Sequence, residues 1–255
     1  MKHSAGNKTS ARRRIFLGIF YAVGLAVLIF AAIGLYNIFS EDTAARDEYN
    51  DLREIANSEI THIIATEDDN NNEPELGSEA ENEPWRELIA LNPDFVGWIE
   101  IPATDVDYPI VRGTDNDYYL RRTFLGESNS AGTIFMDYRA IFDFNTHITI
   151  LYGHNMRDGS MFASLMRYTD ATFLADNTEI RIFTRYGETF YYDVISATRT
   201  HALDDVYSLD FHNVTIAQNY FNHNNSEHFL VLSTCWSGPD RTPTDRLIVI
   251  AARRP

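Results

Sequence analysis

The chain of 255 residues contains a single cysteine, Cys235, and its surroundings suit a nucleophile. Cys235 ends the apolar run FLVLSTC, and the turn-rich run SGPD begins two residues later. A side chain at a strand end beside a loop can meet a substrate, whereas a buried structural thiol, the plain alternative, packs inside the core. We therefore expect Cys235 to act as a nucleophile. A lone cysteine also excludes an internal disulfide and a zinc site built from several cysteines.

A thiol nucleophile needs a partner for its proton, because an unperturbed thiol with a pKa near 8.5 is only about 3% thiolate at pH 7. Of the eight histidines, His154 has the most suitable place, since it directly follows the apolar run ITILYG and precedes a loop. An imidazolium there would favour the thiolate and later protonate a leaving amine. The histidines show no HExxH or other paired spacing, so we expect no metal centre.

If the thiol attacks a carbonyl carbon, the oxyanion that forms needs a donor, and a guanidinium is a permanently charged one. The apolar runs 228–235 and 245–252 flank a turn with one glycine and two prolines, which predicts an antiparallel pair. If the turn centres just before Arg241, opposed residues have numbers that sum to 481. Arg246 then faces Cys235 with Cβ atoms about 5 Å apart. Arg241 falls in the turn itself. The alternative for Arg246 is a surface arginine paired with a nearby acid.

Short apolar runs that predict β-strands dominate the chain from Trp85 to Pro255. They lie at 96–102, 105–111, 132–136, 147–152, 179–185, 189–198, 228–234 and 245–252. Helical patterns are fewer and short, at 85–91, 116–122, 159–168 and 213–222. Eight short strands with a few short helices favour a mostly β fold, a closed or nearly closed barrel, over a doubly wound α/β sheet.

An anchor is predicted near the N-terminus. Residues 15–39 carry no charge, and as a helix they span about 37 Å, enough to cross a hydrocarbon core of ~30 Å. Five bases lie in the tail 1–14 and two acids stand at 41 and 42, which predicts a cytoplasmic N-terminus and an extracellular chain from residue 40 onward. A cleaved signal peptide is the alternative, but its apolar region is normally about 7–15 residues long.

Residues 40–84 are expected to form an extracellular stalk. Apolar residues recur at helical spacing over 41–65, whereas 66–84 contains eight acids and no base and predicts a flexible linker. The folded domain should then run from 85 to 255. An unpaired thiol outside the membrane is a liability without a function, which favours a reactive Cys235. The formal net charge of −16 argues against a nucleic-acid-binding protein.

Several segments of this domain together resemble the class B sortases. They are the stretch from NPDFVGWIEIP to GTIFMD, the stretch LYGHNMRDGSMFASLMRY at 151–168, and LSTC followed by DRLIVIAARR. The resemblance covers the domain from about 85 to 255, in order. It implies an eight-stranded sortase barrel and cysteine transpeptidation at the surface of a Gram-positive bacterium, without a cofactor. A surface protein's C-terminal sorting signal, NPxTx- or xPxTG-like, is cleaved after threonine, held as a thioester on Cys235 and passed to a cell-wall or pilin amine.

The same resemblance assigns residues to the site. Cys235, His154 and Arg246 would be catalytic, and five residues would contact the sorting signal: Asn116, Leu120, Tyr207, Ser233 and Thr234. Each has a structural alternative, since Leu120 suits a core and the last two can simply fill their strand. Two positions depart from the family pattern. Val231 replaces the usual threonine, and Trp236 follows the cysteine where relatives often have an acidic or small residue.

Three other functions compete with this interpretation. A cysteine endopeptidase without efficient transfer would use the same residues. An L,D-transpeptidase is also based on cysteine and histidine, but its SxGC signature is absent. A membrane-tethered adhesin or scaffold would make the placement of Cys235, His154 and Arg246 a coincidence.

Overall fold

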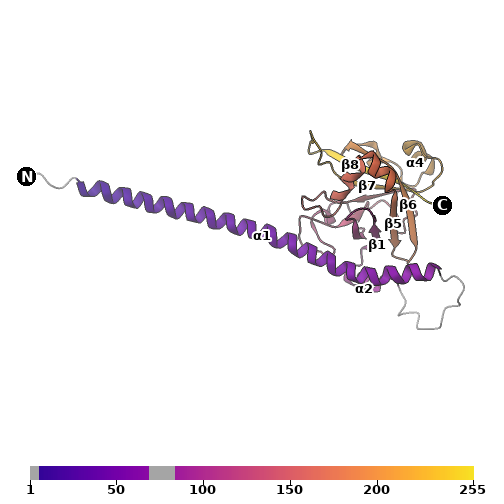
Figure 1. Cartoon of the computed structure of the whole chain (residues 1–255), viewed down its shortest axis with the longest axis horizontal. Coiled ribbons are helices and arrows are strands. Elements are labelled where there is room, and N and C mark those ends of the chain that lie inside the picture. The colour runs from indigo at the N-terminus through magenta and orange to yellow at the C-terminus, as the bar shows by residue number, and fades with distance from the viewer. Residues whose placement is uncertain (1–5, 69–83) are drawn as a thin grey trace, which may run out of the picture. The chain divides into compact units, whose positions relative to one another are not determined.

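The computed structural model describes residues 6–68 and 84–255 (Figure 1). The chain divides into two units, residues 1–44 and 45–255, which we describe separately. Helix α1, Gly6–Asp68, begins in the first unit and ends in the second. The first five residues of the predicted basic tail and most of the predicted acidic linker lie outside the described residues.

The first unit consists of the N-terminal part of α1. Its stretch Phe16–Gly34 is 19 residues long, and by length and composition it fits a helix that crosses a membrane. The apolar side chains described there are exposed, Phe16 and Phe30 most of all. The helix begins at Gly6, nine residues before the predicted span, and continues beyond residue 39.

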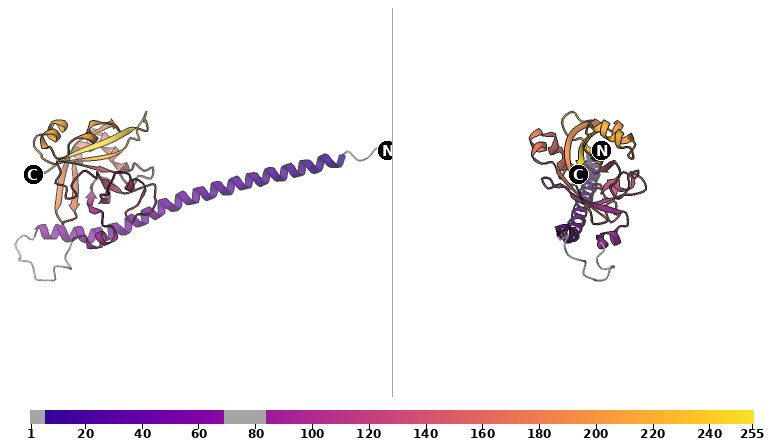
Figure 2. Two further views of the ribbon diagram at one scale, coloured as in Figure 1. Left: turned by 180° about the vertical axis from the view of Figure 1, so that it is seen from behind. Right: turned by 90° about the vertical axis from the view of Figure 1, so that its right-hand side faces the viewer.

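Eight strands of the second unit form a closed barrel, in the order β1-β2-β3-β4-β7-β8-β6-β5. The prediction of a mostly β, closed eight-stranded fold is thus confirmed. The bounds are β1 Phe95–Glu100, β2 Asp107–Val111, β3 Ile134–Met136, β4 Ile148–Tyr152, β5 Glu179–Thr184, β6 Thr189–His201, β7 Phe229–Cys235 and β8 Asp245–Arg253. Two neighbouring pairs, β2–β3 and β4–β7, are parallel, and the others are antiparallel. Two further views show the strands curling around the interior (Figure 2).

Short helices precede the first strand and connect the later ones. They are α2 Arg86–Leu91, α3 Ala171–Asp176, α4 Val214–Phe221 and the 3₁₀ helices η1 Tyr118–Arg121, η2 Ala163–Thr169 and η3 Asp205–Ser208. The predicted helices at 85–91 and 213–222 are confirmed. Those at 116–122 and 159–168 shrink to the 3₁₀ helices η1 and η2. In the second case Gly159 and Met161 have φ values of 90° and 57°, which a right-handed helix cannot contain.

The barrel interior is filled by apolar side chains from every strand. Ile99, Ile150, Leu232 and Val249 are fully buried, and they come from four different strands. Continuous apolar runs such as LVL in β7 and LIVIAA in β8 follow from burial on both faces of these strands. The adjacent strands β4, β7 and β8 position the candidate site residues Cys235, His154 and Arg246.

Residues 45–68 of α1 are part of the second unit. Their buried side chains, Ala45, Tyr49, Leu52, Ala56 and Ile63, recur at helical spacing and form one face of the helix. The sequence predicted a stalk over 40–84 ahead of a domain that begins at 85. In the structure, this stretch of the predicted stalk contributes to the apolar core of the barrel unit.

Candidate active site

Three neighbouring strands bring the predicted catalytic residues to one end of the barrel. In the antiparallel β7–β8 pair Cys235 lies opposite Arg246. In the parallel β4–β7 pair Tyr152, the last residue of β4, lies opposite Ser233, so His154 follows two residues beyond the end of β4, next to the strand that ends in Cys235. Adjacent strands are about 4.8 Å apart. The thiol, the imidazole and the guanidinium therefore belong to three strand ends that lie side by side.

The register predicted for the β7–β8 pair is confirmed, because all of its paired residues have numbers that sum to 481. Arg241 lies in the exposed turn, as predicted. The side chain of Arg246 is half-buried, and its Nη1 donates to the carbonyls of Pro243 and Asp245, both at 3.0 Å. These two bonds hold one terminal nitrogen of the guanidinium against the backbone of the turn that follows β7.

The thiol of Cys235 is free and exposed, so the buried structural thiol is excluded. Its backbone is fixed on both sides. The carbonyl of Cys235 accepts a hydrogen bond from Nδ2 of Asn155 at 2.8 Å, and the next amide, of Trp236, donates to the carbonyl of Asp245 at 3.1 Å. The first of these bonds ties the end of β7 to the residue that follows His154.

The imidazole of His154 is held by a hydrogen bond: its Nε2 lies 2.7 Å from the carbonyl oxygen of Leu120. A carbonyl only accepts, so Nε2 carries a proton and Nδ1 is the nitrogen left for proton transfer. The residue before it must be glycine. A Cβ on Gly153 would lie 2.5 Å from a side-chain atom of Ile134 and 2.6 Å from one of Phe162. A larger residue at 153 would therefore displace the chain just where it leaves β4 and leads to His154.

A pocket of about 360 Å³ has Arg246 in its lining, whereas Cys235 and His154 are not among the residues that line it. Its lining consists of Asn116, Leu120, Phe135, Arg139, Tyr152, Ala202, Tyr207, Ser233 and Arg246. Four of the five residues predicted to contact substrate are among them. The fifth, Thr234, is buried in the barrel wall, and its hydroxyl has no hydrogen-bond partner within the described residues. Side chains alternate along a strand, so Ser233 and Cys235 share one face and Thr234 points to the other.

A buried carboxylate that sequence reasoning missed organises this pocket. The side chain of Asp137 is 0% exposed and accepts from Nε and Nη2 of Arg139 at 2.8 Å, from Asn116 at 3.0 Å and from the hydroxyl of Tyr152 at 2.9 Å. Burial alone raises the pKa of Asp137, but the hydrogen bonds from Arg139 and Tyr152 outweigh it, and the pKa of this carboxyl is lowered. The one sequence signal was an acid and an arginine two residues apart directly after a buried strand.

Stacked aromatic rings form the apolar wall of the pocket. The rings of Phe135 and Tyr152 lie 5.1 Å apart, and those of Tyr152 and Tyr207 lie 6.3 Å apart, both pairs stacked. The hydroxyl of Tyr207 is 2.8 Å from Oγ of Ser233, and its carbonyl accepts from Nη2 of Arg139 at 2.8 Å. Burial raises the pKa of Tyr207, so this hydroxyl stays protonated. Apolar rings with a few fixed polar groups suit an extended peptide segment.

The two departures from the family pattern lie away from this pocket's lining. Val231 is fully buried in β7. Trp236 packs over Gly238, where a Cβ would come within 2.5 Å of the indole, and the guanidinium of Arg199 lies 5.4 Å from the ring centroid. Trp236 therefore fills the space beneath the β7–β8 turn.

Comparison with known proteins agrees with this geometry. The family model for the sortase domain matches residues 99–254. Sortase B of Listeria monocytogenes is 39% identical over 163 residues, which are 59% of this chain and 66% of that protein. Sortase B of Staphylococcus aureus is 27% identical over 253 residues, which are 94% of this chain and 97% of that protein. A solved Staphylococcus aureus sortase B–substrate complex has a TM-score of 0.66 at 26% identity, covering 84% of this chain and 98% of that chain. The chain therefore belongs to the sortase family of cysteine transpeptidases and resembles its class B members.

Proposed function

We propose that this chain is a membrane-anchored transpeptidase that cleaves a C-terminal sorting signal after threonine and transfers the protein to a cell-wall or pilin amine. The observation that carries the proposal is the exposed thiol of Cys235 opposite Arg246, at the end of the strand next to the one that leads to His154. This arrangement provides a nucleophile, a cation for an oxyanion and a group for proton transfer.

In the first half-reaction, the thiolate of Cys235 attacks the carbonyl carbon of the signal's threonine. The oxyanion that forms is stabilised by the guanidinium of Arg246. When the tetrahedral intermediate collapses, the carbon–nitrogen bond breaks and the leaving amine takes a proton from His154. A thioester on Cys235 and a free C-terminal peptide result.

In the second half-reaction, an acceptor amine attacks the thioester carbonyl and gives a proton to His154. Arg246 stabilises the second oxyanion, and the thiolate of Cys235 leaves as the new amide forms. Water in place of the amine would give hydrolysis, which is the alternative function of a surface cysteine endopeptidase. The two reactions share every residue named here and differ only in the acceptor.

The signal's residues before the scissile bond would lie in the pocket, against Asn116, Leu120, Tyr207 and Ser233. The aromatic wall would pack against a proline ring, and the polar groups would meet the peptide backbone. Both NPxTx-like and xPxTG-like signals present a proline two residues before the threonine. We leave Thr234 out of this contact set because it is buried in the barrel wall.

The topology of the proposal follows from the sequence and the anchor. The stretch Phe16–Gly34 would cross the membrane, with the preceding bases in the cytoplasm and the barrel outside. The lone cysteine makes a test direct. A membrane-impermeant maleimide added to intact cells should label Cys235, whereas labelling only after lysis would contradict the orientation.

The activity is tested with full-length protein in detergent and a panel of NPxTx- and xPxTG-like peptides. Each reaction is run with and without glycine or diaminopimelate-type amines, and the products are identified by mass spectrometry. We expect cleavage after threonine and an amine-dependent ligated product. Cys235→Ala should abolish both while leaving the melting temperature unchanged, because a thiol-to-methyl change at an exposed strand end removes little packing. Cleavage by the alanine variant would refute the thioester, and hydrolysis alone would favour the endopeptidase.

A further inference from the structure

The face of α1 that packs on the barrel reaches the backbone that holds His154. Tyr49 is buried, and its hydroxyl donates to the carbonyl of Gly132 at 2.5 Å. Gly132 has a φ of 60°, and a Cβ there would lie 2.8 Å from the carbonyl oxygen of Leu120. That carbonyl oxygen is the acceptor for Nε2 of His154. Two hydrogen bonds, joined by the close approach of Gly132 to the backbone of Leu120, therefore link the helix to the imidazole.

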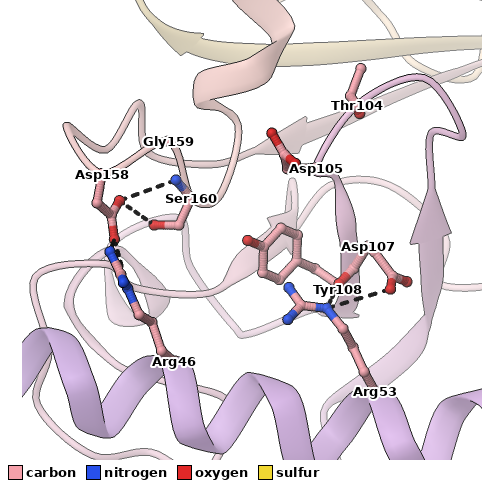
Figure 3. Close-up of a pocket in the computed structure, with 9 residues that line it drawn as sticks. All are labelled: Arg46, Arg53, Thr104, Asp105, Asp107, Tyr108, Asp158, Gly159 and Ser160. Carbon is pink, nitrogen blue, oxygen red and sulfur yellow. Dashed lines mark hydrogen bonds and ion pairs between the residues drawn. The ribbon is translucent and has the colours of Figure 1, made fainter.

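The same helix turn also holds the loop that follows His154. Arg46 pairs with Asp158 at 2.8 Å, as Figure 3 shows. The carboxylate of Asp158 accepts in turn from the amide and the hydroxyl of Ser160, at 3.1 Å and 2.7 Å. The loop closes where the amide of Phe162 donates to the carbonyl of His154 at 2.9 Å. Arg46 thus fixes the outer turn of a loop whose two ends meet at the histidine.

Tyr49 also contacts the loop after His154, through the ring of Tyr108. The ring of Tyr49 meets the ring of Tyr108 edge-on, with centroids 5.4 Å apart. The hydroxyl of Tyr108 accepts from the amide of Met161 at 3.1 Å, in the loop after His154. Tyr49 is therefore connected to His154 by two routes. Its hydroxyl contacts the backbone that leads to the Leu120 carbonyl, and its ring packs on Tyr108, which holds the loop after His154.

We propose that Tyr49 and Arg46 are positioning residues for His154: they fix the Leu120 carbonyl and the 155–161 loop, and so set the orientation of the imidazole toward Cys235. The inference rests on the proposed role of His154 in proton transfer. It assigns the stretch of α1 after the membrane span a part in the reaction. The contacts that carry it are directed hydrogen bonds and an ion pair, whereas the other buried residues of this face, Ala56 and Ile63 among them, are apolar.

The test compares full-length variants in detergent. Tyr49→Phe removes one hydroxyl and keeps the ring, Arg46→Ala removes the ion pair, and Arg46→Lys restores a cation. Ile63→Ala is the matched control, because Ile63 is buried on the same helix face but lies about 21 Å further along the axis. For each protein, kcat and KM for a cleaved peptide are measured from about pH 5 to pH 9. The rate of alkylation of Cys235 by iodoacetamide is followed over the same range.

We expect Tyr49→Phe to lower kcat about fivefold, with KM within about twofold, because the buried hydrogen bonds of this hydroxyl with the Gly132 carbonyl and the Thr133 hydroxyl are lost while the pocket is untouched. Its pH profiles for kcat and for alkylation should both shift, and Arg46→Lys should recover most of the loss seen in Arg46→Ala. Ile63→Ala should lower the melting temperature and leave both pH profiles in place. An unshifted Tyr49→Phe profile, or the same shift in Ile63→Ala, would overturn the inference.

The proposed function and the positioning role of Tyr49 can fail independently of each other. If the wild-type protein cleaves no peptide, the proposed function fails. The alkylation profile still tests the positioning, because it reports the His154–Cys235 pair without turnover. If the wild type cleaves peptide and Tyr49→Phe matches it at every pH, the inference fails and the function stands.

Discussion

Replacement of Asp137 by asparagine should destabilise the barrel through the loss of one buried negative charge. The carboxylate accepts side-chain hydrogen bonds from Arg139, Asn116 and Tyr152 and is itself 0% exposed. An asparagine of the same shape keeps one acceptor and turns an amide toward these donors. A charge-assisted hydrogen bond contributes about 1.5–3 kcal/mol. Because the side chain of Arg139 is 35% exposed and can turn to water, we expect a net loss of about 2–3 kcal/mol, at the lower end for a broken buried pair.

The loss should depend on pH in a way that identifies the charge as its cause. The pKa of Asp137 is lowered in the folded protein. Its contribution to stability is therefore complete above the unfolded pKa of about 3.9, and it disappears as the pH falls through the lower folded value. Asp137→Asn should differ from the wild type at pH 7 and approach it below about pH 4.

Thermal unfolding of the full-length protein in detergent measures this difference. For a unit of this size, 1 kcal/mol corresponds to about 2–4 °C, so we expect a drop of roughly 4–12 °C at pH 7. Asp143→Asn is the matched control, because this turn carboxylate accepts from the amide of Asn145, a bond that asparagine can keep. It should change stability by less than about 0.5 kcal/mol. An Asp137→Asn deficit that is equally large at pH 3 and pH 7 would refute the electrostatic account.

Three further predictions concern the site. Arg246→Lys keeps the charge but loses the planar donor geometry, so kcat/KM for a cleaved peptide should fall at least about tenfold, whereas Arg241→Lys should be near neutral; the reverse ranking would disprove the assignment. Gly153→Ala places a methyl group 2.5 Å from a packed side chain and should lower the unfolding free energy by about 1–3 kcal/mol, measured by thermal melting; an unchanged melt would contradict the tight packing. Tyr207→Phe and Ser233→Ala should each raise KM about threefold, and the double variant should add little, since one hydrogen bond joins them; fully additive effects would argue against that bond.

Much of the barrel could be predicted from local patterns. The eight apolar runs became the eight strands, because burial on both faces or on one face leaves a continuous or alternating signal. The pairing of Cys235 with Arg246 followed from the position of one turn, since a hairpin fixes the register of both its strands. The burial of Thr234 could also have been predicted, because side chains alternate along a strand and Thr234 therefore points to the opposite face from Cys235.

Other features needed the folded chain. The hydrogen bond from His154 to the carbonyl of Leu120 joins residues 34 positions apart, and no local pattern encodes it. The network around Asp137 joins β3, β4 and the loop before η1 in the same way. The packing of residues 45–63 on the barrel was visible as a helical apolar pattern, but the pattern did not identify the surface that covers it.

The position of β8 also determines when the site is formed during folding. This strand lies between β7 and β6 and pairs with both, so the sheet cannot close before β8 is inserted. It carries Arg246, and the β4–β7 contact that places His154 beside Cys235 joins segments roughly 80 positions apart, a separation that slows folding. A chain whose β8 has not yet docked therefore lacks Arg246 beside Cys235, and with it the group that we propose stabilises the oxyanion. Catalytic competence should appear with the final cooperative closure of the sheet, so incompletely folded chains should be unable to acylate themselves on passing peptides.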